Sequence, residues 1–127
     1  MEPSKILVID DEKDLREALQ EALTSAGFTV LIADNGKDGL AQALHHKPHL
    51  ILLDISMPQM NGHKVLSELR KNPWGQNVHV LLLTNADDPT NIVRGLSLDG
   101  DEYIIKSQVS LGDITKKVKQ YLTGYHS

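Results

Sequence analysis

The stretch "KILVIDDEKD", residues 5–14, places four consecutive apolar residues directly before two adjacent aspartates. An apolar run of this length without polar alternation is typical of a strand that is covered on both faces. Asp10 and Asp11 follow at its end, and two unit charges about 4 Å apart repel by roughly 4 kcal/mol at an effective dielectric constant of about 20. A cation that joins the two carboxylates would offset this repulsion, so the stretch indicates both a parallel sheet and a charged site at its edge.

Four further apolar runs follow along the chain, and segments with helical spacing of apolar residues separate them. The five predicted strands are Lys5–Asp10, Phe28–Ala33, His49–Asp54, Val78–Thr84 and Asp101–Lys106. Gly27 is typical of the end of a helix, and Asp88-Pro89 of the start of one. Ser110 and Asp113 resemble a capping box at the start of the last helix. This alternation predicts an α/β fold: a doubly wound, flavodoxin-like (βα)5 arrangement around a five-stranded parallel sheet of order 2-1-3-4-5.

Composition limits the class of protein. A chain of 127 residues is expected to form a single domain, residues 1–127, with a substantial core. The formal net charge of -4 argues against a general nucleic-acid binder, and the absence of cysteine excludes disulfides and thiolate metal sites. No apolar run approaches the roughly 20 residues that span a bilayer. We therefore expect a soluble cytoplasmic domain with no membrane partner and no direct nucleic-acid partner.

Polar residues end the predicted strands: Asp10 and Asp11 the first, Asp54 the third, Thr84 the fourth and Lys106 the fifth. In open α/β sheets, ligands bind beyond the carboxyl ends of the strands where the strand order reverses, here between the first and third strands. Three carboxylates without cysteine or histidine favour a hard divalent cation, and Mg²⁺ above others. A lysine and a hydroxyl beside them would complete a pocket for a tetrahedral anion, with one carboxylate as candidate nucleophile.

Four segments carry a family resemblance. "ILVIDDE", "LILLDISMPQMNG", "VLLLTNA" and "DEYIIKS" match in order the site segments of bacterial response-regulator receiver domains, and the chain resembles this family over about residues 4–123. The resemblance implies that Asp54 is the phosphoacceptor. It further implies a Mg²⁺ site formed by Asp11, by Asp54, by Asp10 through metal-bound water, and by the backbone carbonyl of Ser56.

The same resemblance implies a switch in two-component phosphorelay signalling. Such a switch is not an enzyme in the usual sense, although it assists its own phosphorylation and dephosphorylation. The phosphoryl donor would be a sensor histidine kinase or a histidine phosphotransfer protein, and the downstream target is not identified by the sequence. Thr84 and Lys106 would contact the phosphoryl oxygens, and Tyr103 matches the family's switch aromatic. The face formed by the fourth helix, fifth strand and fifth helix would report the change, and the resemblance also allows a phosphorylation-dependent homodimer.

Two positions depart from the family pattern. Ser107 stands where the family usually has a proline that follows the lysine through a cis bond, and a cis bond without proline costs about 2.5–4 kcal/mol. Either that bond is retained, or it is trans and Lys106 is aimed differently. Asn85 stands where a small residue is usual, and its bulk would narrow access to Asp54 or add a hydrogen bond.

Simpler interpretations of the same residues remain open at this point. Asp10 and Asp11 could be a helix N-cap and a first-turn acid, Asp54 could cap the following loop, and Lys106 could be a solvated edge lysine. The histidines of "HHKPH", residues 45–49, fit no standard zinc spacing and are expected to be solvated.

Two other functions also compete. A haloacid-dehalogenase-like phosphatase would use Asp54 as nucleophile, but Ser56 stands where that class has a second acid. A flavodoxin-like flavin module is disfavoured because the chain has a single Trp and a single Phe with which to stack a flavin.

Overall fold

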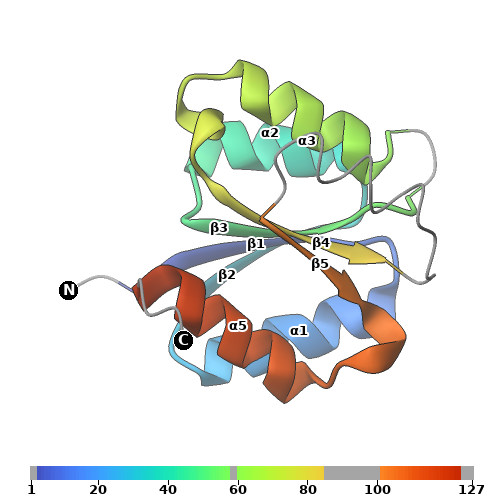
Figure 1. The fold of residues 1–127 in the computed structure, drawn as a ribbon, viewed down its shortest axis with the longest axis vertical. Helices are drawn as coiled ribbons and strands as arrows, with labels where there is room; N and C mark the ends of the chain where they lie inside the picture. Colours follow the sequence, from blue (N-terminus) through green and yellow to red (C-terminus); the bar gives the residue numbers. More distant parts are fainter. Residues whose placement is uncertain (1–2, 58–59, 85–100, 124–127) are drawn as a thin grey trace.

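The computed structural model describes residues 3–57, 60–84 and 101–123 (Figure 1). The five strands form one parallel sheet in the order β2-β1-β3-β4-β5, which confirms the predicted topology. The strands are β1 (Lys5–Ile9), β2 (Thr29–Ala33), β3 (Leu50–Asp54), β4 (His79–Thr84) and β5 (Glu102–Ile105). Each lies within its predicted run and is shorter by one residue at one end, or at both ends for β5.

Helices cover both faces of this sheet. The helices are α1 (Lys13–Ser25), α2 (Gly36–His46), α3 (Gly62–Lys71) and α5 (Leu111–Thr123), with short 3-10 turns η1 (Trp74–Gln76) and η2 (Lys106–Gln108). Figure 1 shows α2 and α3 on one side of the sheet and α1 and α5 on the other. The helix predicted to begin at Asp88-Pro89 lies outside the described residues, as does Asn85. The two helix layers account for strands that are apolar without alternation.

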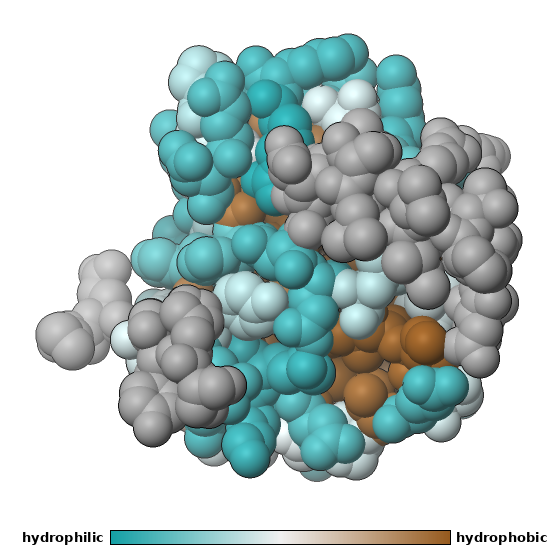
Figure 2. Space-filling view, viewed as in Figure 1, coloured by the Kyte–Doolittle hydropathy of each residue, from teal (hydrophilic) through white to brown (hydrophobic). Residues whose placement is uncertain are grey.

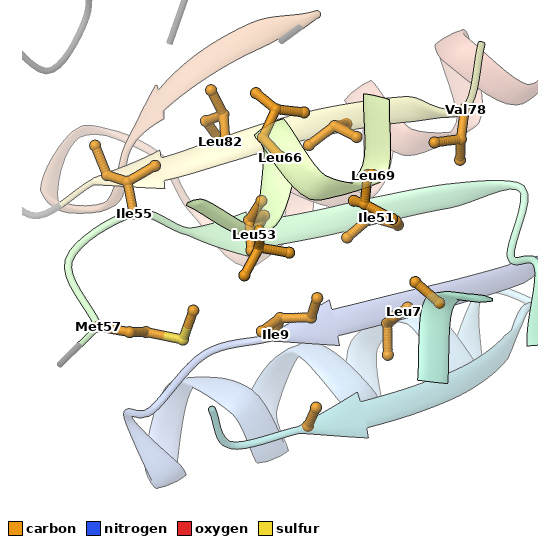
Figure 3. Packing of buried hydrophobic residues seen from close by; sticks show 14 residues of the cluster. Leu7, Ile9, Ile51, Leu53, Ile55, Met57, Leu66, Leu69, Val78 and Leu82 are labelled. Carbon is orange, nitrogen blue, oxygen red and sulfur yellow. The ribbon is translucent and has the colours of Figure 1, made fainter. Parts of the chain in front are cut away.

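Among the described residues, the core consists of two apolar clusters, one on each side of the sheet. Alternate residues of the central strands, such as Leu7 and Leu53, point toward α2 and α3, where they pack against Leu66 and Leu69 (Figure 3). The remaining strand residues pack on the other side against α1 and α5, in a cluster of Ile6, Val8, Leu19, Leu23, Leu50, Leu52, Leu81, Leu83, Ile104, Ile114 and Val118. Because β3 is buried along its whole length, the side chain at its end is buried too.

Two predicted helix ends are confirmed. Gly27 has a φ of 99°, and the N–H groups of Gly27 and Phe28 donate to the carbonyls of Thr24 and Leu23 at 3.0 and 3.1 Å. This pair of bonds is the Schellman motif that closes many helices. At the start of α5, the Asp113 amide donates to Ser110 Oγ at 3.0 Å, and the Ser110 amide donates to Asp113 Oδ2 at 3.0 Å. The capping box therefore forms with aspartate as its acid.

The surface seen in Figure 2 is mostly hydrophilic over the described residues, with an apolar area at the lower right of the view, between the end of β5 and the start of α5. Leu111, the first residue of α5, is one of two large apolar side chains that are exposed among the described residues. Of the helices that the structure describes, none has the length and apolar composition needed to cross a bilayer.

Candidate functional site

The carboxyl ends of β1 and β3 bring three carboxylates together. One oxygen from each of Asp10, Asp11 and Asp54 lies within 4.8 Å of the other two. The pairing of Ile9 with Leu53 sets the ends of the two strands level, so the residues that follow them meet at one edge of the sheet. Asp10 and Asp54 are fully buried, whereas Asp11 is exposed. The site is therefore a buried acidic pair with a third carboxylate at its opening.

Lys106, the residue that follows β5, extends into this acidic group. Its Nζ lies 2.8 Å from Asp10 Oδ2, 3.3 Å from Asp54 Oδ2 and 3.2 Å from Glu12 Oε1, and its side chain is only 8% exposed. The peptide bond from Lys106 to Ser107 is trans. With serine in place of the family's proline, Lys106 still points at the carboxylates. The interpretation of Lys106 as a solvated edge lysine is therefore wrong.

Burial and neighbouring charges perturb both members of the central ion pair. Burial raises the pKa of Asp54 to about 7; the Ser56 amide and Lys106 act against this, and Asp10 adds to it. The Ser56 N–H donates to Asp54 Oδ1 at 2.8 Å. For Lys106, burial lowers the pKa, but the contacts with Asp10 and Asp54 outweigh it and the net shift is upward. Without a further cation, Asp54 therefore takes up a proton near neutral pH.

The carboxylate oxygens of this site fit a hard metal ion. Within the described ranges, Asp10 Oδ2 and Asp54 Oδ2 are buried and receive no hydrogen bond of good geometry, although Lys106 lies near both. Buried acceptors without donors are rare and costly. All the ligand atoms offered are oxygens, which suits Mg²⁺ rather than a softer metal. The residues present therefore fit the predicted cation.

The loop after β3 fits closely against Asp54. Asn61 is the N-cap of α3, and its side chain accepts the N–H of Lys64 at 3.1 Å. A Cβ atom added to Gly62 would lie 2.6 Å from the carbonyl oxygen of Asp54 and 2.6 Å from Cα of Ile55. The glycine of this Asn-Gly pair is required by the close approach of α3 to the end of β3.

Thr84 and Tyr103 lie on adjacent strands beside the acidic group. Thr84 is the last residue of β4 and is buried, and the strand pairing places it opposite Ile105, the residue before Lys106. Tyr103 is half-buried on β5 and packs against the apolar cluster beneath α2 and α3. The structure thus gathers the predicted residues Asp10, Asp11, Asp54, Ser56, Thr84 and Lys106 at one edge of the sheet, with Tyr103 on the neighbouring strand.

Two residues that sequence reasoning did not single out also hold the site. Glu12 is the N-cap of α1, and its N–H donates to Asp10 Oδ1 at 2.8 Å. Arg16 Nη1 donates to the backbone carbonyl of Asp10 at 3.0 Å. The N-cap position thus belongs to Glu12 rather than to Asp10 or Asp11. The sequence did offer one indication of these two residues: Glu12 is the third acid of the "DDE" run, and Arg16 follows it four residues later.

The histidines of residues 45–49 do not form a metal cluster. The rings of His45 and His46 meet edge to face at 4.7 Å, and His49 Nδ1 accepts the N–H of Lys5 at 2.9 Å. Among the described residues, Asp10, Asp11 and Asp54 are the one group of three or more potential ligands close enough to share an ion.

Comparison with known proteins agrees with this architecture. The family model for the response regulator receiver domain matches residues 6–119. A probable transcriptional regulator, ycf27 of Porphyridium aerugineum, is 38% identical over 106 residues, which cover 84% of this chain and 43% of the relative. The chain thus spans less than half the length of the curated relatives it matches.

Solved structures agree with the fold. A CheY-like response regulator receiver domain protein from Methanospirillum hungatei JF-1 superposes with a TM-score of 0.89 at 28% identity, covering 97% of this chain and 96% of that one. The phosphorylated cyanobacterial phytochrome response regulator RcpA superposes with a TM-score of 0.83 at 25% identity, covering 98% of this chain and 97% of that one. With its family match, strand order and acidic site, this chain belongs to the response regulator receiver domain family of two-component signal transduction.

Proposed function

We propose that residues 1–127 form a single receiver domain in which Asp54 accepts a phosphoryl group from a histidine kinase or histidine phosphotransfer protein. The observation that carries the proposal is the environment of Asp54. This buried carboxylate lies 3.3 Å from the Lys106 ammonium and within 4.8 Å of Asp10 and Asp11. RcpA, a similar protein, is described as phosphorylated, which supports the same chemistry here.

The acidic residues would hold the metal that this chemistry needs. Asp10, Asp11 and Asp54, with the backbone carbonyl of Ser56, would bind Mg²⁺. When bound, Mg²⁺ would supply positive charge against the phosphoryl oxygens and against the acidic group itself.

The two carboxylate oxygens of Asp54 have different hydrogen-bond surroundings. Oδ1 accepts the Ser56 amide, which fixes the rotation of the carboxylate, while Oδ2 receives no hydrogen bond from the described residues. Oδ2 is therefore the oxygen available to attack phosphorus. The P–N bond of the phosphohistidine breaks, the new O–P bond forms, and the bonding electron pair leaves with the imidazole. Lys106 stabilises the charge on the transferred oxygens, and positioning of this kind supplies most of the catalysis in phosphoryl transfer.

The switch that follows would use Thr84 and Tyr103. Phosphorylation would draw the Thr84 hydroxyl toward the new phosphoryl oxygens, and Tyr103 would move into the space beside it, a shift between two states biased by local charge. The face of β5 and α5, with the helix predicted to begin at Asp88-Pro89, would then present a changed surface to a downstream protein or to a second phosphorylated copy. We expect this to take place in the cytoplasm, in a signalling switch rather than a turnover enzyme.

Intact mass spectrometry tests the assignment. The protein is incubated with Mg²⁺ and acetyl phosphate, and we expect one phosphoryl group per chain in the wild type and none in Asp54→Asn. Asp14→Asn is the matched control, because Asp14 is an exposed aspartate in the first turn of α1. Circular dichroism checks that both variants fold. Label that persists in Asp54→Asn would refute the phosphoacceptor assignment, and steady turnover of phosphate esters would favour the phosphatase instead.

A further inference from the structure

Glu12 lies beside the acidic group, outside the three carboxylates that could share a metal ion. We propose that Glu12 is a positioning residue for Lys106. Its carboxylate holds the lysine ammonium at the exposed side of the site, so that Asp10 and Asp54 can turn to a cation while Lys106 stays in place. The inference rests on the function proposed above and adds a residue to that same site.

The first argument is the geometry of the Lys106 ammonium. It lies within 3.3 Å of three carboxylates, but the contact with Glu12 Oε1, at 3.2 Å, is the one with the angles of a hydrogen bond. In the described part of the chain, the nearby Oδ2 atoms of Asp10 and Asp54 receive no such bond. Lys106 therefore has a hydrogen-bond partner in Glu12 at the exposed side of the site, in addition to its ion pairs with the two buried aspartates.

The second argument is the backbone of Glu12. This residue is the N-cap of α1, yet its side chain makes no capping hydrogen bond to the helix. Glutamate is also a poor N-cap compared with Ser, Thr, Asp or Asn. Its N–H donates to Asp10 Oδ1 at 2.8 Å, which ties the position of Glu12 to the acidic group. The Glu12 carboxylate thus contacts Lys106 instead of capping its own helix.

The third argument is the competition between two cations for the same oxygens. A metal held by Asp10 and Asp54 would compete with Lys106 for the negative charge of the same two carboxylates. Glu12 is outside the metal cluster, and its side chain is 47% exposed, so it can keep its contact with the ammonium when the aspartates are occupied. Because exposed ion pairs contribute little, we expect each effect of removing it to be about two- to fivefold.

The first experiment uses the metal-free protein. A limiting amount of an acetylating N-hydroxysuccinimide ester is added in the presence of EDTA, and acetylation of Lys106 is measured by peptide mass spectrometry relative to the exposed Lys47. Glu12→Gln is expected to raise the rate at Lys106 about two- to fivefold, because the ammonium loses its partner on the solvent side. Asp14→Asn removes one charge from the same helix and is expected to leave the rate unchanged. Equal rates at Lys106 in the wild type and both variants would overturn the proposal.

The second experiment is a double-mutant cycle on Mg²⁺ affinity, measured by isothermal titration calorimetry. Glu12→Gln is expected to weaken Mg²⁺ binding about two- to fivefold more than Asp14→Asn, because Lys106 then competes harder for Asp10 and Asp54. In a Lys106→Met background, the two substitutions are expected to have the same effect. An undiminished difference in that background would show that Glu12 acts without Lys106 and would overturn the proposal. Failure of the wild type to bind Mg²⁺ or accept phosphate would instead count against the proposed function, while the acetylation rates still decide the role of Glu12.

Discussion

Gly62 touches the backbone of Asp54: a Cβ atom on this glycine would lie 2.6 Å from the Asp54 carbonyl oxygen. The first residue of α3 is thus packed against the strand end that carries the candidate phosphoacceptor. Gly62→Ala must push α3 away from β3, and inserting a methyl group into a well-packed region typically costs about 1–3 kcal/mol. We expect a loss of that size in the free energy of unfolding by urea, together with slower labelling of Asp54 by acetyl phosphate.

Gly112 provides the matched control for this substitution. It lies in the first turn of α5, where an added Cβ would meet nothing closer than Ser110 Oγ at 3.6 Å. Gly112→Ala is expected to be neutral or to stabilise the protein by up to about 1 kcal/mol, because alanine favours the helix. If both alanine variants unfolded at the same urea concentration, the close approach of Gly62 to Asp54 would not be a constraint.

The raised pKa of Asp54 predicts that the metal-free protein loses stability as pH rises. Its pKa is about 7 in the folded chain against 3.8 for an unperturbed aspartate, so the fold favours the protonated form. The stability that the protonated Asp54 contributes to the fold is fully present below pH 3.8 and is lost as pH rises through about 7. A shift of about 3 units sets an upper limit of roughly 4 kcal/mol. The measurement is the free energy of unfolding in EDTA at a series of pH values.

Asp54→Asn isolates that contribution from the other titrating groups. The difference in unfolding free energy between the wild type and Asp54→Asn is expected to shift in favour of the variant between about pH 4 and pH 7. Added Mg²⁺ favours the ionised carboxylate and is expected to oppose this loss. A difference that is constant with pH would mean that Asp54 titrates in the folded protein as it does in the unfolded chain.

The fold was predictable because strand pattern and helix ends are local properties of the sequence. The apolar runs, Gly27 and the Ser110–Asp113 pair each identify their own element, and right-handed crossovers between parallel strands leave few possible topologies. The strand limits were less accurate: Phe28 and His49, for example, were included in the predicted strands but lie directly before the first residues of β2 and β3.

The sequence predicts those site residues that lie at the ends of strands, but not those that come from helices. Asp10, Asp54 and Lys106 each follow or end a strand, so the sheet itself brings them together. Glu12 and Gly62 each contact a different element of the fold. Glu12, at the start of α1, contacts Lys106, and Gly62, in α3, packs against the end of β3. The "DDE" run marks Glu12 as a third acid, but the approach of each residue to its partner depends on how each helix packs against the sheet.

The capping box at the start of α5 makes a separate prediction about stability. Ser110→Ala removes the hydroxyl that accepts the Asp113 amide, and loss of an N-cap costs about 0.5–2 kcal/mol. We expect a decrease of that size in the free energy of unfolding by urea. Ser107→Ala, at an exposed serine of η2, is the control and is expected to have little effect. Equal stabilities of the two variants would mean that the reciprocal bonds of the box do not contribute.

Tyr121 links α5 to β5 and makes the last prediction. Its hydroxyl donates to Glu102 Oε1 at 3.0 Å, and Lys117 forms an ion pair with the same carboxylate. Burial first, and then Glu102, raise the pKa of Tyr121 to about 12. At pH 11 an ordinary tyrosine is about nine-tenths ionised, so the absorbance of tyrosinate at that pH should be nearly the same in the folded wild type and in Tyr121→Phe.

Stability gives a second measurement of the same contact. The shifted pKa of Tyr121 stabilises the fold fully below about pH 10 and is lost as pH rises toward 12. Near neutral pH, Tyr121→Phe is expected to lose about 0.5–1.5 kcal/mol, the usual value of one hydrogen bond, in unfolding by urea. A Tyr121→Phe variant that matches the wild type in stability, and lacks one full tyrosinate of absorbance at pH 11, would show that the phenol is solvated and does not hold α5 against β5.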